Sequence, residues 1–367
     1  MREKRHNKFQ RLIVPGLIFQ SVVIAGGYGT GAELAEFFFP FGALGGLIAM
    51  CTVTFLFWAA VCAVTFEFAR VFKTYDYRSL FKQLLGPFWF LFEICYLVLL
   101  LIVLAVVVAA SGSNINEVFG LNRWIGVGIM AVGVIYLVVM GTGVIEKVLS
   151  FWSYVLYAVY LVFMIMSFIK FGESIVYQLG TVKEIGPGWA LGGARYAFYN
   201  LGVIPLILFS TVDAKNRAEA IGSGLIAGAI GIIPAIMLFI VMIGQYPETA
   251  TATVPVNVVF QHLNVRWLQI VFQIVLFGTL IETGSGFIKA VSDRLEGQFS
   301  KPENPRRWIR PVTALICVLL GVLVSTFGLT GLIAKGYGTI TWGFFVLYVI
   351  PMLTWGVYKI VRHKKAR

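Results

Sequence analysis

The first apolar segment of this chain is interrupted in its middle by glycines. Residues 12–25 are largely apolar, residues 26–31 read GGYGTG, and an apolar segment resumes at Ala32. Each glycine lowers helix propensity by about 1 kcal/mol relative to alanine. A free backbone amide or carbonyl is costly in a lipid bilayer, so a chain keeps such a break there mainly where the freed groups line a cavity. The interruption therefore constrains both the fold and the function.

The composition is that of a membrane protein. Of the 367 residues, 59% are hydrophobic and 13% are charged, whereas a soluble domain carries about 25% charged residues. The formal net charge is +12, but the basic residues lie between apolar segments, where they indicate topology rather than a nucleic-acid surface. We therefore expect a lipid bilayer, and no nucleic acid, among the partners.

The sequence offers little that an enzyme or a cofactor site needs. The four cysteines show no C-x-x-C spacing, and the three histidines lie outside the centres of the apolar segments, which argues against metal and redox chemistry. Gly27, Gly29 and Ala32 fit part of a dinucleotide fingerprint, but that motif needs a preceding strand and an acidic residue about 20 positions on. We expect no enzyme and no cofactor.

A helix of about 20 apolar residues crosses a bilayer. We expect a single all-α membrane domain, residues 1–367, with ten spans. The predicted spans are residues 12–38, 42–72, 87–113, 124–141, 145–170, 193–211, 219–244, 266–290, 311–328 and 337–358. Outside the spans we expect a short amphipathic helix at residues 75–82, an outer loop at 172–192 and an outer cap at 247–264.

The basic residues predict the orientation of the spans. If both termini are cytoplasmic, 23 of the 29 lysines and arginines lie on the inner side. The positive-inside rule favours this arrangement and an even number of spans.

A second interruption falls in the sixth span. Asn200 and Gly202 weaken a helix there, and Pro205 removes a backbone donor and clashes with the preceding turn. Spans 1 and 6 are five spans apart, so the two halves of the chain run through the membrane in opposite directions. Paired interruptions of this kind indicate a central binding site in an inverted-repeat transporter. Close helix packing is the alternative explanation for such residues.

With these features the chain resembles a known superfamily. The motif Gly27-Tyr28-Gly29-Thr30-Gly31, the ten spans and the broken span 6 resemble the amino acid–polyamine–organocation superfamily and, within it, the bacterial YkvI-like membrane proteins. The resemblance implies a LeuT-type fold with a five-plus-five inverted repeat, here at about residues 12–170 and 193–358. It also implies a multi-pass protein of the bacterial cytoplasmic membrane.

The same resemblance implies that an amino-acid-like solute binds between spans 1 and 6. The outer half of span 1 begins near Gly31, where free amides suit a carboxylate, and the inner half ends near Ala25, where free carbonyls suit a cation. Aromatic rings either form walls or pack in the core. The candidate solute-binding residues are Gly27, Tyr28, Gly29, Thr30, Gly31, Phe198, Tyr199, Asn200 and Gly202.

Two acids complicate a carboxylate site. Glu33 and Glu36 lie on one face of the outer half-helix. Acids there stabilise the helix dipole, but they also repel a nearby anion. Either the solute is an amine or zwitterion, or Glu33 is protonated when the solute binds.

Span 8 carries a second group of polar residues. Thr279, Glu282, Thr283 and Gly286 share one helical face, and a carboxylate buried at membrane depth is a functional hypothesis by default. In the related sodium-coupled transporters, two adjacent span 8 hydroxyls share a sodium ion with span 1 carbonyls; here the adjacent pair is Glu282 and Thr283. Glu282 is therefore a sodium ligand, a carrier of the coupling proton, or a structural hydrogen-bonding group. The candidate ion-coupling residues are Glu282, Thr283, Thr279, Ala25 and Glu33, with a sodium site at Ala25, Glu282 and Thr283.

The sequence thus predicts an ion-coupled secondary transporter of a small organic solute, an amino acid or a related amine, that works by alternating access. Sodium or a proton is the coupling ion. The alternative is a sensor that resembles the membrane subunits of spore germinant receptors and does not transport. No sequence feature indicates an oligomeric state.

Overall fold

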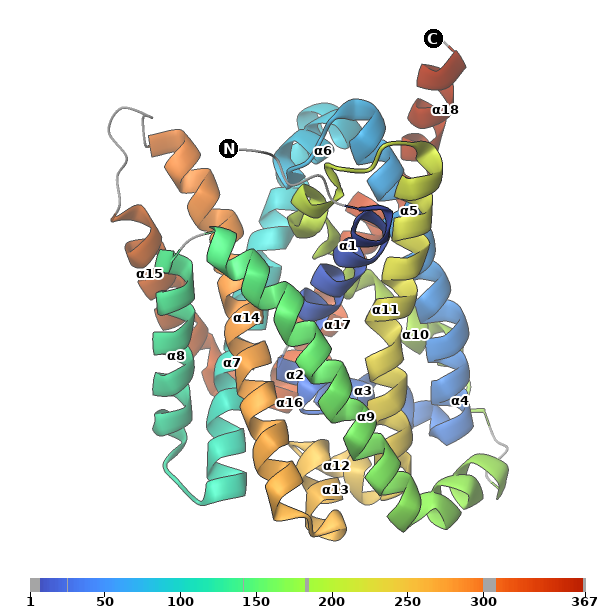
Figure 1. Ribbon diagram of the computed structural model, residues 1–367, viewed down its shortest axis with the longest axis vertical. Helices are drawn as coiled ribbons and strands as arrows, with labels where there is room; N and C mark the ends of the chain where they lie inside the picture. The colour runs from blue at the N-terminus through green and yellow to red at the C-terminus, as the bar shows by residue number, and fades with distance from the viewer. Residues whose placement is uncertain (1–6, 25, 141, 182–184, 300–307, 366–367) are drawn as a thin grey trace.

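The computed structural model describes residues 7–24, 26–140, 142–181, 185–299 and 308–365 (Figure 1). These residues form helices and connecting turns, and they contain no β-strand. The elements are α1 (Lys8–Val23), α2 (Gly26–Gly29), α3 (Ala32–Phe38), η1 (Phe39–Phe41), α4 (Gly42–Ile48), η2 (Ala49–Thr54), α5 (Phe55–Phe72), α6 (Tyr77–Leu85), η3 (Gly86–Phe88), α7 (Trp89–Phe119), α8 (Arg123–Met140), α9 (Thr142–Thr181), α10 (Trp189–Leu201), η4 (Ile204–Thr211), α11 (Arg217–Ile243), α12 (Glu248–Thr251), α13 (Pro255–Leu263), α14 (Arg266–Phe299), α15 (Ile309–Val324), η5 (Ser325–Phe327), α16 (Leu329–Gly331), η6 (Leu332–Tyr337), α17 (Gly338–Phe344), η7 (Phe345–Val349), η8 (Met352–Gly356) and α18 (Val357–Lys365).

The architecture is that of an all-α membrane protein. Within the described residues, eight helical segments are long and apolar enough to cross a bilayer. They correspond to the predicted spans 2, 3, 4, 5, 7, 8, 9 and 10. The two remaining predicted spans are the first and the sixth, which are shorter because both are interrupted. The fold class predicted from the sequence is confirmed.

The first span consists of three helical pieces. α1 ends at Val23, α2 makes a single turn, and α3 begins at Ala32. Gly31 joins the last two pieces with φ of 81°, a left-handed conformation that only glycine adopts without strain. The glycine run therefore breaks the helix, as the sequence predicted.

The sixth span changes its winding at the residues that weaken it. α10 ends at Leu201, and the chain continues past Gly202 as the tighter 3₁₀ helix η4, with Pro205 in its first turn. The side-chain amide of Asn200 donates to the carbonyl of Tyr196 at 3.0 Å, so it bonds to its own helix one turn back. Asn200, Gly202 and Pro205 thus mark the second interruption.

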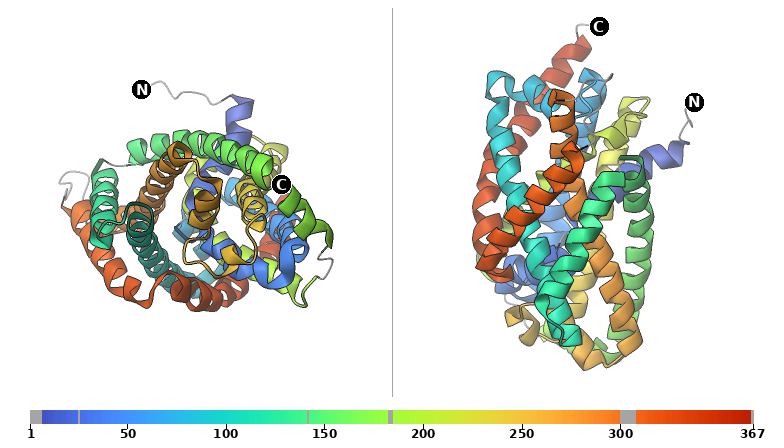
Figure 2. Two further views of the ribbon diagram at one scale, coloured as in Figure 1. Left: turned by 90° about the horizontal axis from the view of Figure 1, so that it is seen from below. Right: turned by 90° about the vertical axis from the view of Figure 1, so that its left-hand side faces the viewer.

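The long helices form two groups. In one group, α1, α5, α11 and the α10–η4 span pack together; in the other, α7, α8, α14 and α15 pack together, and α9 contacts both groups. We call these the bundle and the scaffold. The second half of α1 and all of α2 lie in the interior of the molecule (Figures 1 and 2), and residues 15–24 are buried. Both interruptions therefore lie deep inside the protein.

Three of the shorter helices lie at the two ends of the molecule. α6 lies at the same end as the start of α1 and the end of α18, and α12 and α13 lie at the opposite end (Figure 1). This placement agrees with an even number of spans, with the amphipathic helix expected near residues 75–82 and with the cap expected at 247–264. The outer loop expected at 172–192 is wrong in part, because α9 continues as a helix to Thr181.

Small residues set the distance between α11 and α5. A Cβ on Gly224 would overlap the backbone of Ala63, whereas a Cβ on Gly222 would meet only the end of Leu12 at 3.5 Å. The two glycines are two positions apart on one helix, but only Gly224 lies at the close contact. Gly224 therefore permits the two longest bundle helices to touch.

We predict that Gly224→Ala destabilises the protein, because the added methyl group forces α11 away from α5. The cost of such overpacking is about 1–3 kcal/mol, measured as a lower midpoint of thermal unfolding in detergent. Gly222→Ala is the matched control and should leave the midpoint unchanged or raise it, since alanine favours a helix more than glycine does. Equal midpoints for both variants would contradict the close contact.

Candidate functional site

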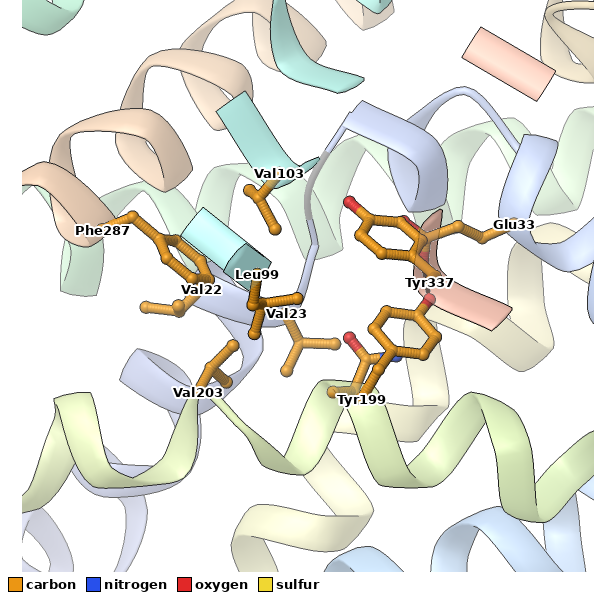
Figure 3. Close-up of a pocket in the computed structure, with 10 residues that line it drawn as sticks. Val22, Val23, Glu33, Leu99, Val103, Tyr199, Val203, Phe287 and Tyr337 are labelled. Carbon is orange, nitrogen blue, oxygen red and sulfur yellow. Dashed lines mark hydrogen bonds between the residues drawn. The ribbon is translucent and has the colours of Figure 1, made fainter. Parts of the chain in front are cut away.

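A buried cavity lies between the two interruptions. Its free volume is about 10 Å³, which is about enough for one water molecule. Figure 3 shows the side chains around it. The lining residues come from spans 1, 3, 6, 8 and 10 and are Val22, Val23, Glu33, Leu99, Val103, Tyr199, Asn200, Val203, Phe287 and Tyr337.

Glu33 is the acidic group of this cavity. Its side chain is buried, with 1% of the residue exposed, and the hydroxyl of Tyr199 donates to its Oε2 at 2.5 Å. The carboxyl group also folds back against the break, because a Cβ on Gly27 would overlap Oε1 of Glu33. The chain thus places its own carboxylate where the sequence led us to expect the carboxylate of a solute.

Two tyrosines complete the polar end of the cavity. The rings of Tyr199 and Tyr337 are stacked, with centroids 4.4 Å apart and planes within 8°. The hydroxyl of Tyr337 is buried and has no hydrogen-bond partner. In Figure 3 both rings lie beside Glu33, whereas Val22, Val203 and Phe287 lie on the opposite side. The cavity is therefore polar at one end and apolar at the other.

Most residues of the glycine motif shape the break without lining the cavity. The hydroxyl of Tyr28 points to span 7 and donates to the carbonyl of Gly231 at 3.3 Å. The hydroxyl of Thr30 donates to the carbonyls of Gly26 and Gly27, at 2.7 and 3.1 Å. The Gly26 carbonyl also accepts from the backbone amide of Thr30 at 3.2 Å, so the Thr30 hydroxyl adds a bond to that carbonyl and gives the Gly27 carbonyl a partner.

Four other predicted residues also face away from the cavity. A Cβ added to Gly29 would meet Leu276, and one added to Gly202 would meet Phe344. A Cβ added to Gly31 would meet Met242 and Pro255. Phe198 packs against Phe57 and Phe345. Of the predicted solute-binding residues, the structure brings Tyr199 and Asn200 to the cavity.

An open pocket lies on the cap side of α3. It is lined in part by Ala32 and Glu36 of α3, together with Tyr246 and Ala250 near α12. Glu36 is exposed, whereas Glu33, one turn earlier on the same helix, is buried. α3 therefore presents one carboxylate to the open pocket and one to the closed cavity.

The cap is bonded both to the break and to the scaffold. The amide of Val256 donates to the carbonyl of Thr30 at 3.2 Å. The next residue, Asn257, accepts from Gln273 at 3.1 Å, and Gln273 in turn accepts from Asn114. Two consecutive residues of α13 thus connect span 1 with spans 8 and 3.

One face of α14 contacts the first break. A Cβ added to Gly29 would meet Leu276, and one added to Gly26 would meet Leu280. One turn further along α14, the hydroxyl of Thr283 donates to the carbonyl of Ile24 at 3.2 Å. This contact joins span 8 to the inner edge of the break, where we expected a sodium site. Ala25, another predicted member of that site, lies outside the described residues.

Glu282 directly precedes Thr283 on α14. Its residue is 2% exposed and its Oε1 has no hydrogen-bond partner. Thr279 bonds to the carbonyl of Val275 in its own helix, at 2.9 Å. Of the predicted span 8 residues, Thr283 is the one that the structure bonds to span 1.

Two further carboxylates within the spans, Glu67 and Glu93, are ion-paired. Glu67 accepts from Arg70 of its own helix at 2.7 and 2.8 Å. Glu93 of α7 pairs with Arg294 of α14, which connects two scaffold helices. Both acids therefore have structural partners.

Sequence reasoning missed most of the cavity wall. Tyr337 had a usable signal, because Gly336-Tyr337-Gly338 repeats the glycine–tyrosine–glycine pattern of residues 27–29. Leu99, Val103 and Phe287 had none, since they are apolar residues within apolar helices.

Comparisons with known proteins identify the fold. No family model and no curated protein sequence matches the chain. Among solved structures, MhsT in complex with L-phenylalanine has a TM-score of 0.65 and 15% identity over 99% of both chains. A substrate-bound, outward-open Na⁺-coupled sialic acid symporter has a TM-score of 0.63 and 11% identity, covering 91% of this chain and 78% of the symporter.

A mutant of the Eremococcus coleocola manganese transporter is similar to the same degree. Its TM-score is 0.62 and its identity is 15%, over 96% of this chain and 80% of the transporter. Such low identities show a common fold. The chain therefore has the LeuT-type fold that the sequence predicted.

We predict that Tyr199→Phe destabilises the protein, because it removes the hydrogen bond to the buried carboxylate and retains the stacked ring. The expected loss is about 1.5–3 kcal/mol of unfolding free energy, measured by thermal unfolding in detergent. Tyr196→Phe is the matched control, since the buried hydroxyl of Tyr196 has no hydrogen-bond partner. If both variants unfold at the wild-type temperature, the Tyr199–Glu33 bond does not stabilise the site.

Proposed function

We propose that this protein is an ion-coupled secondary transporter of a small organic solute, an amino acid or a related amine. The observation that carries the proposal is the small cavity between the interruptions of spans 1 and 6, which is lined at one end by Glu33, Tyr199 and Tyr337. A site in the middle of two broken spans is the usual position for the solute of an inverted-repeat transporter.

The walls of the cavity support alternating access. Val22 and Tyr199 belong to spans of the bundle, whereas Leu99 and Phe287 belong to the scaffold. A rocking motion of one group against the other would separate these walls and open the cavity to one side of the membrane. The open pocket at Glu36 lies on the side from which the outer route would form.

The coupling ion in this proposal is sodium, bound where the bundle meets the scaffold. The Thr283 hydroxyl and the Ile24 carbonyl are 3.2 Å apart, and oxygen atoms of this kind are ligands for hard cations. An ion shared by span 8 and span 1 would favour the conformation in which the two groups touch. Two of the solved structures with this fold contain sodium-coupled or amino-acid-bound transporters.

The finer assignments are also part of the proposal. We place the chain in the amino acid–polyamine–organocation superfamily, close to the YkvI-like proteins, with repeats at about residues 12–170 and 193–358. We place it in a bacterial cytoplasmic membrane with both termini inside, because the basic residues concentrate on that side.

The test is uptake into proteoliposomes. A thermal-shift screen of amino acids and amines, with sodium, with potassium and at several pH values, first identifies a ligand. The labelled ligand should then accumulate under an inward sodium gradient and not under potassium. Binding without accumulation under any sodium or proton gradient would contradict transport and favour the sensor.

We predict that Thr283→Val lowers sodium-driven uptake to the rate seen without a gradient, because the variant loses a sodium ligand and keeps a side chain of similar shape. Ser285→Ala is the control on the same helix, since the hydroxyl of Ser285 bonds only to the carbonyl of Glu282. Full sodium dependence in Thr283→Val would contradict the proposed site.

Glu282→Gln separates the proton alternative from the sodium site. Because the bond to the Ile24 carbonyl comes from Thr283, we predict that Glu282→Gln retains sodium dependence. Loss of gradient dependence in Glu282→Gln, with normal coupling in Thr283→Val, would instead identify Glu282 as the carrier of a coupling proton.

A further inference from the structure

Two cations lie over one tryptophan ring at the end of the molecule that carries both termini. The guanidinium carbon of Arg78 is 5.0 Å from the ring centroid of Trp89, and the ammonium nitrogen of Lys82 is 5.2 Å from it. Arg78 and Lys82 are exposed residues one turn apart on α6, and Trp89 is the first residue of α7. Figure 1 shows α6 at the end where α1 begins and α18 ends. The fold thus gathers two exposed positive charges around one aromatic ring.

No carboxylate pairs with these two cations. Within the described part of the chain, neither Arg78 nor Lys82 forms an ion pair. A third cation, Arg294 of α14, lies 5.9 Å from the same ring centroid but is paired with Glu93. The carboxylate of Asp76 accepts from the first turn of α6 as its N-cap. The two α6 cations therefore keep their N–H donors for a partner outside the chain.

The opposite face of α6 is fixed in the protein. Leu80, Phe81 and Leu84 are buried, and the ring of Phe81 stacks on that of Phe92 in α7, with centroids 3.5 Å apart. The same two helices that meet at this stack carry the cations and the tryptophan. The positions of Arg78 and Lys82 relative to Trp89 are thus set before any ligand binds, which lowers the entropy cost of binding.

An exposed apolar face continues from the tryptophan along α7. Phe90, Ile94 and Leu97 are exposed, and their spacing of four and three residues places them on one side of the helix. They belong to a segment that is long and apolar enough to cross a bilayer. Cations at the end of this segment and apolar side chains along it match a molecule with an anionic head and hydrocarbon tails. A free phosphate ion would use the cations and leave the apolar face unused.

We propose that Arg78, Lys82 and Trp89 bind the headgroup of an anionic phospholipid whose acyl chains lie along the exposed face of α7. A guanidinium stacked on an aromatic ring still presents its N–H edge to phosphate oxygens, and tryptophan side chains prefer the headgroup level of a bilayer. Basic clusters beside a membrane span attract anionic headgroups. None of the three residues lines the cavity between spans 1 and 6, so this site is separate from the proposed solute site.

The experiment counts phospholipids bound to the full-length protein by native mass spectrometry in detergent. The protein is titrated with dioleoylphosphatidylglycerol or with dioleoylphosphatidylcholine, whose choline group balances the phosphate charge. The first phosphatidylglycerol should bind about tenfold more tightly than the first phosphatidylcholine. Equal affinities for the two lipids would overturn the proposal.

Variants of the two cations locate the site. Arg78→Gln and Lys82→Gln should each weaken binding of phosphatidylglycerol about fivefold, and the double variant about 30-fold, because each cation near an anionic headgroup contributes about that factor. Arg123→Gln is the matched control, since Arg123 is an exposed cation 5.3 Å from the ring centroid of Trp124 at the opposite end of α7. It should leave the affinity unchanged.

Wild-type affinity in the double variant, or an equal loss in Arg123→Gln, would overturn the assignment of the site. If the double variant does not fold, the two single variants give the same comparison.

A soluble competitor separates a lipid site from a site for any phosphate. Glycerol 3-phosphate carries the phosphate but has no acyl chains to lie along α7. In tenfold excess over phosphatidylglycerol it should displace little of the bound lipid. Complete displacement would show an anion site that does not use the apolar face, and the lipid assignment would be wrong.

Discussion

The whole arrangement depends on how backbone groups freed inside a membrane find partners. The break in span 1 frees carbonyls and amides where no lipid can bond to them. Within the break, the Thr30 hydroxyl donates to the carbonyls of Gly26 and Gly27. Val256 of the cap donates to the Thr30 carbonyl, and Thr283 of span 8 donates to the Ile24 carbonyl. Two separate elements, the cap and span 8, thus converge on one irregular segment. A straight helix would need none of these contacts and would leave no cavity.

These hydrogen bonds also link the small site to the long helices around it. The cap residue Val256 bonds to the break, and its neighbour Asn257 belongs to a buried amide group with Gln273 and Asn114 of the scaffold. Thr283 forms the second connection, on the opposite side of the break. A change in the position of span 1 must therefore alter contacts with the scaffold at both ends of the cavity. Coupling between solute, ion and helix movement needs such shared contacts.

The sequence predicted the fold well because lipid imposes strong rules on composition and backbone. Spans, an even topology and both interruptions follow from apolar length, basic loops and glycine or proline content. The site was harder to predict. Glu33 and Tyr199 were named in advance, but Tyr28 and Phe198 point away from the cavity, since helix periodicity does not give side-chain directions at a break. The apolar wall carries no chemical signal, and only the tertiary structure brings Leu99 and Phe287 together.

The most direct test of this account is an experimental density map of the protein in lipid with the solute that the thermal-shift screen identifies. The account predicts density for one small molecule between the interruptions of spans 1 and 6, in contact with Glu33 and Tyr199 on one side and with Leu99 and Phe287 on the other. Density at another site, or spans 1 and 6 wound as continuous helices with no space between them, would contradict it.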